Sequence, residues 1–140
     1  MALVLMNEGG LELLDKTLKD ALSVDESYLL KLFNVSTLTP NATMTSSDFA
    51  AKTATFTNYS AATLSRGGWS AASSSSNTAV SVYSAAISWT CGATGDTVYG
   101  YLIEGATSNK VLWAEKFSVA RALGSADVLN ITPKFTMCSA

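Results

Sequence analysis

The chain has 140 residues and a mass of 14.6 kDa, enough for one hydrophobic core but too short for two ordinary domains, so we expect residues 1–140 to form a single domain. The net charge is −2 and the lysines and arginines are scattered, which argues against nucleic acid as a partner because phosphate binding needs grouped Lys and Arg. No run approaches the roughly 20 apolar residues of a membrane-spanning helix, and residues 1–6 lack a basic leader, so we expect a soluble protein made in the cytoplasm without membrane attachment.

The N-terminal segment combines a short apolar stretch with a helical pattern. Residues 1–6 are apolar and predict a strand or an anchoring arm. Leucines then recur at helical spacing and predict a helix over residues 10–22. Asn7 is the candidate N-cap of this helix, and Gly9 and Gly10 weaken its first turn.

Short apolar runs between polar residues predict a β-rich region over residues 28–138. Tyr28 to Val35 has the form of a buried strand, and Ser47 to Ala51 has the form of one helical turn. Another strand is expected from Thr53 to Tyr59. Residues 60–77 are low in complexity and predict a long surface loop.

The C-terminal half has a regular spacing of strand and turn signals. Strands are expected at four segments, residues 79–90, 97–104, 110–117 and 128–137. In the hairpin formed by the second and third of these, Glu104 is expected opposite Lys110, and Tyr101 opposite Trp113. Five to seven short strands with little helix predict a mostly β fold, an antiparallel β-sandwich of jelly-roll type with one N-terminal α-helix.

The composition excludes the commonest catalytic arrangements. Without histidine the chain has no Ser-His-Asp or Cys-His arrangement and no imidazole metal ligand, so we expect no enzymatic activity, no metal and no cofactor. Carboxylates lie near predicted strand ends, but their spacing marks no glycosidase pair; they are Asp96, Glu104, Glu115 and Asp127. Cys91 and Cys138 lack the CxxC spacing of zinc sites and are either buried free thiols or a disulfide.

The aromatic residues allow a carbohydrate-binding interpretation. Seven of them could supply a platform on which sugar rings stack, or could pack in the core or at an interface instead; they are Tyr59, Trp69, Tyr83, Trp89, Tyr99, Tyr101 and Trp113. A carbohydrate-binding module is therefore one alternative function.

Several tracts resemble small virion proteins of tailed bacteriophages. They are Asn7-Glu8-Gly9-Gly10-Leu11-Glu12-Leu13-Leu14, Leu30-Lys31-Leu32-Phe33, Ala54-Thr55-Phe56-Thr57-Asn58-Tyr59, Val98-Tyr99-Gly100-Tyr101-Leu102-Ile103, Val111-Leu112-Trp113-Ala114-Glu115-Lys116-Phe117 and Val128-Leu129-Asn130-Ile131-Thr132-Pro133-Lys134-Phe135. The resemblance implies a capsid decoration or cement protein on the virion surface, with the major capsid protein as its partner. Capsid geometry would favour a homotrimer at local threefold positions. A tail, baseplate or fibre-associated protein is the alternative within the same virion.

Two segments are the candidate interfaces with a partner. The apolar arm Leu3, Val4, Leu5 and Met6 would add a strand to a neighbour's sheet, or else form an edge strand of its own domain. Arg66 and Trp69, in the predicted loop, are residue types that anchor interfaces. Trp69 either pins that loop to the body of the protein or is an exposed contact residue.

Overall fold

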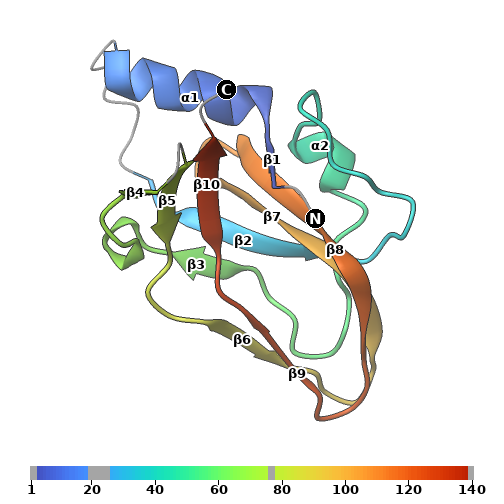
Figure 1. Cartoon of the computed structure of the whole chain (residues 1–140). Helices are drawn as coiled ribbons and strands as arrows, with labels where there is room; N and C mark the ends of the chain where they lie inside the picture. Colours follow the sequence, from blue (N-terminus) through green and yellow to red (C-terminus); the bar gives the residue numbers. More distant parts are fainter. Residues whose placement is uncertain (1–2, 19–25, 76–77, 139–140) are drawn as a thin grey trace.

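The computed structural model describes residues 3–18, 26–75 and 78–138 (Figure 1). Antiparallel strands dominate this part of the chain, so the predicted mostly β class is confirmed. In chain order the elements are β1 (Val4–Leu5), α1 (Asn7–Leu18), β2 (Tyr28–Phe33), α2 (Ser46–Phe49), β3 (Ala62–Leu64), the 3₁₀ helix η1 (Arg66–Gly68), β4 (Ser73–Ser75), β5 (Thr78–Val82), β6 (Ile87–Thr90), β7 (Asp96–Gly105), β8 (Val111–Leu123), β9 (Val128–Ile131) and β10 (Lys134–Cys138).

The strands form three antiparallel sheets. A five-stranded sheet has the order β1-β8-β7-β2-β3, a three-stranded sheet the order β10-β5-β4, and a two-stranded sheet pairs β6 with β9. Figure 1 shows α1 and α2 above the five-stranded sheet, with β6 and β9 below it. The large sheet therefore has one face toward the helices and one toward the smaller sheets.

Successive side chains of β2 alternate between the two faces of the large sheet, and each face has its own hydrophobic cluster. Leu30 and Leu32 lie in the main cluster, which also contains residues of β6 and β9. Phe33 belongs to a second cluster with Phe49 of α2 and Met6, on the helical side. The period of two in a strand places neighbouring side chains on opposite faces, so this single run anchors both layers.

Helix α1 begins earlier than the sequence predicts. It starts at Asn7, so the predicted start at residue 10 and the N-cap role of Asn7 are both wrong; residues 19–22 of the predicted helix lie outside the described residues. The reason is contact with β8: the Met6 N–H donates to the Leu112 carbonyl at 2.9 Å. A Cβ on Gly9 would lie 2.3 Å from the same carbonyl oxygen, so only glycine permits this approach.

The segment from Thr53 to Tyr59 is not the strand that its sequence predicts. Beyond one isolated bridge between Phe33 and Thr53, its backbone bonds go elsewhere. The Thr55 N–H donates to the Asp96 carboxylate at 2.7 Å, and the Thr57 N–H donates to the Thr94 carbonyl at 2.9 Å. The Asp96 carboxylate and the Thr94 carbonyl thus accept the bonds that the carbonyls of a neighbouring strand would otherwise accept.

Asp96 holds this segment in place through several hydrogen bonds. Its carboxylate accepts bonds from Asn34, from the backbone and hydroxyl of Thr55, and from the Thr97 N–H. Partial burial acts to raise the pKa of Asp96, but these bonds together outweigh it and hold the pKa below its ordinary value. The ionised carboxylate therefore stabilises the folded state.

We expect Asp96→Asn to lower the free energy of unfolding at pH 7 by about 1 kcal/mol, at the low end for charged hydrogen bonds because solvent reaches the carboxylate. Because the folded-state pKa is depressed, this stabilisation is present above the unfolded-state pKa and is lost as pH falls through the folded-state pKa. Urea unfolding of both proteins across pH 2–7 measures it. A difference that stayed constant down to the lowest pH would contradict the role of the charge.

The predicted long loop at residues 60–77 is also wrong, because it contains β3, η1 and β4. Ala62 pairs with Leu30 of β2, and Ser74 pairs with Ala79 of β5. Both pairings join segments through tertiary contacts that local composition does not reveal. Likewise, two predicted C-terminal strands are each split: β5 and β6 replace residues 79–90, and β9 and β10 are separated at Pro133, which has no N–H to donate.

The β7–β8 hairpin forms, but its predicted register is wrong. Tyr101 lies opposite Glu115, and Glu104 lies opposite Val111. The pairing shifts by one residue between these positions, which leaves Leu112 as an additional residue in β8. That bulge presents the Leu112 carbonyl to the start of α1, so the shift serves the docking of the helix.

Candidate functional site

Strands β8 and β9 each have an edge without a strand partner in the described part of the chain. β8 pairs with β7 except at Leu112 and residues 117–120, and on its other side β1 covers only Trp113 and Ala114. β9 pairs with β6 alone. The two strands follow each other in sequence, yet each is bonded into a different sheet, so residues 115–123 and β9 face one another without a ladder.

An irregularity in β8 shapes this open side. The pairing moves from Arg121 to Lys116 while β7 advances only from Val98 to Gly100, so residues 117–120 have no one-to-one partners in β7. Such bulges bend a strand and redirect its side chains. Here the bulge presents Val119, whose side chain is 65% exposed.

The space between the two strands is a groove, which we call the β8–β9 groove. It has a volume of about 340 Å³ and continues into a second hollow of about 430 Å³ beside Val128. Its main lining residues are Phe117, Val119, Arg121, Leu129, Ile131 and Lys134. Ser118, Asn130 and Thr132 also line it, so the lining mixes apolar, basic and neutral polar side chains.

Glu115 is the acidic residue of this groove, and Tyr101 engages it. The Tyr101 hydroxyl donates to the Glu115 carboxylate at 2.8 Å. Burial, and then this bond to a carboxylate, raise the pKa of Tyr101 far above its ordinary value, so the phenol stays protonated. Arg121 and Lys134 lie exposed nearby, which favours a partner carrying an acidic group.

A smaller cleft lies between the edges of β1 and β10, and we call it the β1–β10 cleft. Its volume is about 240 Å³. Its lining consists of Leu3, Leu5, Phe135, Thr136 and Met137. Both bordering strands are at the ends of their sheets, so an unpaired edge flanks the cleft on each side.

The predicted arm lies as an edge strand of its own domain. Val4 and Leu5 pair with β8, while Leu3 and Leu5 line the β1–β10 cleft. Val4 packs on the helical side, and Met6 is fully buried there. Addition of this arm to a neighbour's sheet stays a prediction.

Arg66 and Trp69 lie apart from the groove. Arg66 is exposed in η1. Trp69 is half-buried, with its ring 5.4 Å from Tyr83 and 5.6 Å from Trp113, both in edge-to-face geometry. This packing pins the segment to the body of the protein. The groove was not predicted from the sequence, although continued alternation past Phe117 is a signal that the strand extends beyond residue 117.

Another polar cluster surrounds Glu104. On the helical side, Glu104 is only 1% exposed; it forms an ion pair with Lys31 and accepts a bond from Ser46 at 3.1 Å. The neighbouring Tyr59 hydroxyl accepts the Leu32 N–H at 2.8 Å, and its pKa is raised by burial and also by the charge of Glu104. The side chains of Lys31, Ser46, Tyr59 and Glu104 line a pocket of about 340 Å³.

The aromatic residues are mostly used for packing. Trp89, Tyr101 and Trp113 are each less than a tenth exposed, and Trp113 lies 4.6 Å from the ring of Phe135. Cys91 is a buried free thiol, which contradicts the disulfide alternative for this residue. Among the described residues no cluster of acidic residues and cysteines is arranged to hold a metal ion, and no helix there is long and apolar enough to cross a membrane.

Comparison with known proteins adds no assignment. The chain matches no protein-family model and no curated protein.

Proposed function

We propose that the protein is a non-enzymatic phage capsid decoration or cement protein, which binds the assembled shell through the β8–β9 groove and stabilises it. The observation that carries this proposal is the groove itself: two strand edges unpaired within the described residues, apolar side chains among its lining, and exposed Val119 and Val128 at its margin. Exposed strand edges are templates for pairing with another chain. The resemblance of the sequence to virion proteins supplies the class of partner.

The mechanism is addition of a strand. An extended segment of the major capsid protein would lie along the free edge of β8, with main-chain hydrogen bonds giving affinity. Its apolar side chains would enter the groove, and an acidic side chain would meet Arg121 or Lys134. A ligand that binds only the assembled lattice stabilises that lattice by mass action.

Two finer expectations belong to this proposal. The stacking of a five-stranded sheet over smaller sheets supports a sandwich, and we propose the jelly-roll type for it. We also propose a homotrimer on the virion surface, since capsids offer local threefold positions. The tail-associated alternative uses the same groove and differs in the number of copies per particle.

The test is binding to purified bare shells of the phage that carries the gene. We expect Val119→Asp to weaken binding at least tenfold, about 1.4 kcal/mol, because it places a charge on the apolar margin of the groove. Leu11→Asp is the matched control, since Leu11 is similarly exposed at 63% but lies on α1. Equal loss in both variants, or no loss in either, would remove the groove from the proposal.

Quantitative mass spectrometry of purified particles separates the remaining alternatives. A copy number comparable to that of the major capsid protein supports decoration of the head. A number lower by orders of magnitude supports the tail, and absence from particles overturns the virion function.

A further inference from the structure

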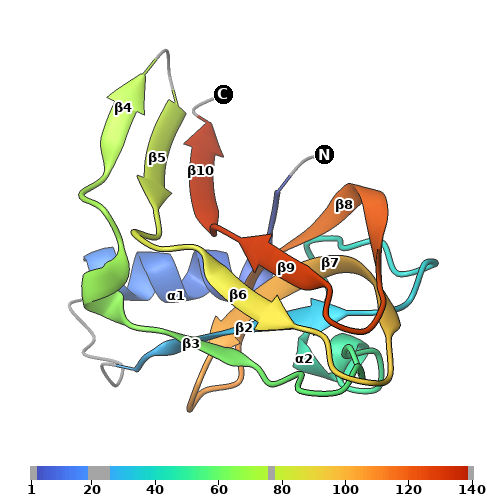
Figure 2. The same cartoon turned by 90° about the horizontal axis from the view of Figure 1, so that it is seen from below.

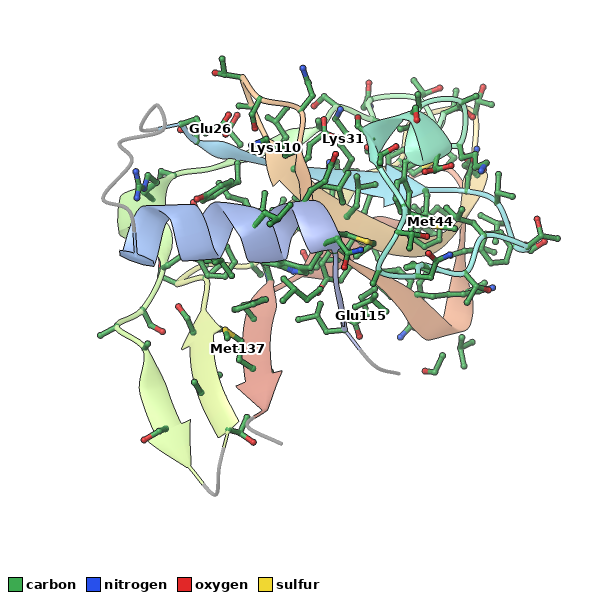
Figure 3. All side chains as sticks on the ribbon, turned by 90° about the horizontal axis from the view of Figure 1, so that it is seen from above. Glu26, Lys31, Met44, Lys110, Glu115 and Met137 are labelled. Carbon is green, nitrogen blue, oxygen red and sulfur yellow. The ribbon has the colours of Figure 1, made fainter. Side chains whose placement is uncertain are left out.

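The three-stranded sheet projects from the body of the protein. Figures 2 and 3 both show β4, β5 and β10 extending beyond the other elements, with β4 along the outer margin. The sequence from Gly67 to Gly95, which supplies β4 and β5, contains no charged residue. β4 and β5 therefore lack the charges that normally keep exposed strands apart, whereas β10 has one, Lys134, at its first position.

The base of this sheet is firmly attached. The Ser70 N–H donates to the Val82 carbonyl at 2.8 Å, and the Tyr83 N–H donates to the Pro133 carbonyl at 2.9 Å. Gly68 packs directly on the Tyr83 ring, where a Cβ would lie 2.4 Å from the nearest ring carbon. A rigid sheet loses little conformational freedom when another strand is added to it.

Both edges of the sheet are unpaired within the described residues. β4 consists of serines, pairs only with β5, and has no charge, proline or bulge to protect its outer edge. β10 also pairs only with β5, and its open side borders the β1–β10 cleft. Met137 of β10 is 48% exposed there, and Figure 3 shows it on the projecting sheet.

We propose that a second copy of this chain covers these edges, with β4 of one copy pairing with β10 of the next. Since β4 and β10 are each antiparallel to β5, they run parallel to each other, and rotation about an axis along the strands brings one beside the other. Each chain carries both halves of the contact, and β4 has no charge that would repel Lys134, the one charged residue of β10.

The contact is head-to-tail; such a contact gives a ring where the rotation between copies closes and an open filament where it does not, and the proposal here is a closed ring. A three-residue strand gives a short ladder, and closure strengthens it because every copy then makes two contacts. The number three in the ring rests on the proposed capsid function, whereas the head-to-tail contact does not.

The test uses the isolated protein, without shells, in sedimentation velocity and light scattering at micromolar concentration. We expect the wild type to have three times the monomer mass of 14.6 kDa. Ser74→Lys blocks β4 and Met137→Lys blocks the open side of β10, so each variant alone is expected to be a monomer. Mixed together, they are expected to form a two-chain species, because each retains the edge that the other lacks.

The controls separate edge pairing from folding and from shell binding. Ser88→Lys changes an exposed serine of β6, outside the projecting sheet, and is expected to keep the wild-type mass. Equal unfolding midpoints show that the variants fold, and Ser73→Lys is a second block of β4. A monomeric wild type, or Met137→Lys at full mass beside monomeric Ser74→Lys, overturns the head-to-tail contact. A trimer that fails to bind shells leaves it standing and removes the proposed function alone.

Discussion

Lys31→Met is expected to lower the free energy of unfolding by about 3 kcal/mol, the low end for breaking a buried ion pair, since Lys31 is partly exposed. The variant leaves the Glu104 carboxylate, 1% exposed, with the hydrogen bond from the Ser46 hydroxyl but without its ion-pair partner. Urea unfolding at pH 7 measures the loss. A variant that unfolds within about 1 kcal/mol of the wild type would show that water reaches Glu104 in the folded state.

The double variant Lys31→Met/Glu104→Leu shows whether Lys31→Met destabilises the protein by leaving a buried charge unpaired or by losing packing contacts. Replacing both partners of a buried ion pair by apolar residues of similar size is often neutral or stabilising. We therefore expect the double variant to recover most of the stability that Lys31→Met loses. Because Leu29 lies opposite Glu104, the leucine would pack against an apolar neighbour. A double variant less stable than the single one would contradict this account.

Gly9→Ala and Gly10→Ala are expected to have opposite effects, although the two glycines are adjacent in α1. At Gly10 the nearest atom to an added Cβ is Leu5 Cδ2 at 3.9 Å, so alanine gains its helix propensity, up to about 1 kcal/mol. At Gly9 the added Cβ would lie 2.3 Å from the Leu112 carbonyl oxygen. We expect that clash to cost about 1–3 kcal/mol, as overpacking does.

Thermal and urea unfolding of the two alanine variants measure the change in the free energy of unfolding that each substitution causes. The sign of the difference is the informative quantity, since helix propensity alone predicts stabilisation at both positions. Gly67→Ala, where an added Cβ has no atom within 4 Å, is the control for a glycine outside the helix. Stabilisation by Gly9→Ala would mean that α1 does not rest on β8 in solution.

The local sequence pattern was sufficient to predict the elements that have the hydrogen bonds of an ordinary strand or helical turn. Tyr28 to Phe33 is a strand because alternate residues suit two apolar faces, and Ser46 to Phe49 is a helical turn as its composition indicates. Thr53 to Tyr59 failed for a nonlocal reason: the acceptor for its backbone is the side chain of Asp96. No window around Thr53 contains that carboxylate.

The candidate site was harder to predict than the fold class. The apolar run Leu3 to Met6 predicted either an arm that reaches a neighbour or an edge strand, and Val4 and Leu5 pair with β8. The β8–β9 groove arises from which strands do not pair, and from a bulge over residues 117–120. Pairing partners are set by the packing of whole sheets, so the sequence of β8 alone does not reveal its free edge.

Cys91 gives the protein an internal reporter of its own opening. Its thiol is 1% exposed, and its backbone exchanges hydrogen bonds with Ala126 and Asp127 in the turn that joins β8 to β9. In a Cys138→Ser protein, a thiol reagent would react only at Cys91, and only while this region is open. The labelling rate therefore reports the local opening equilibrium, and a partner bound in the β8–β9 groove should slow it.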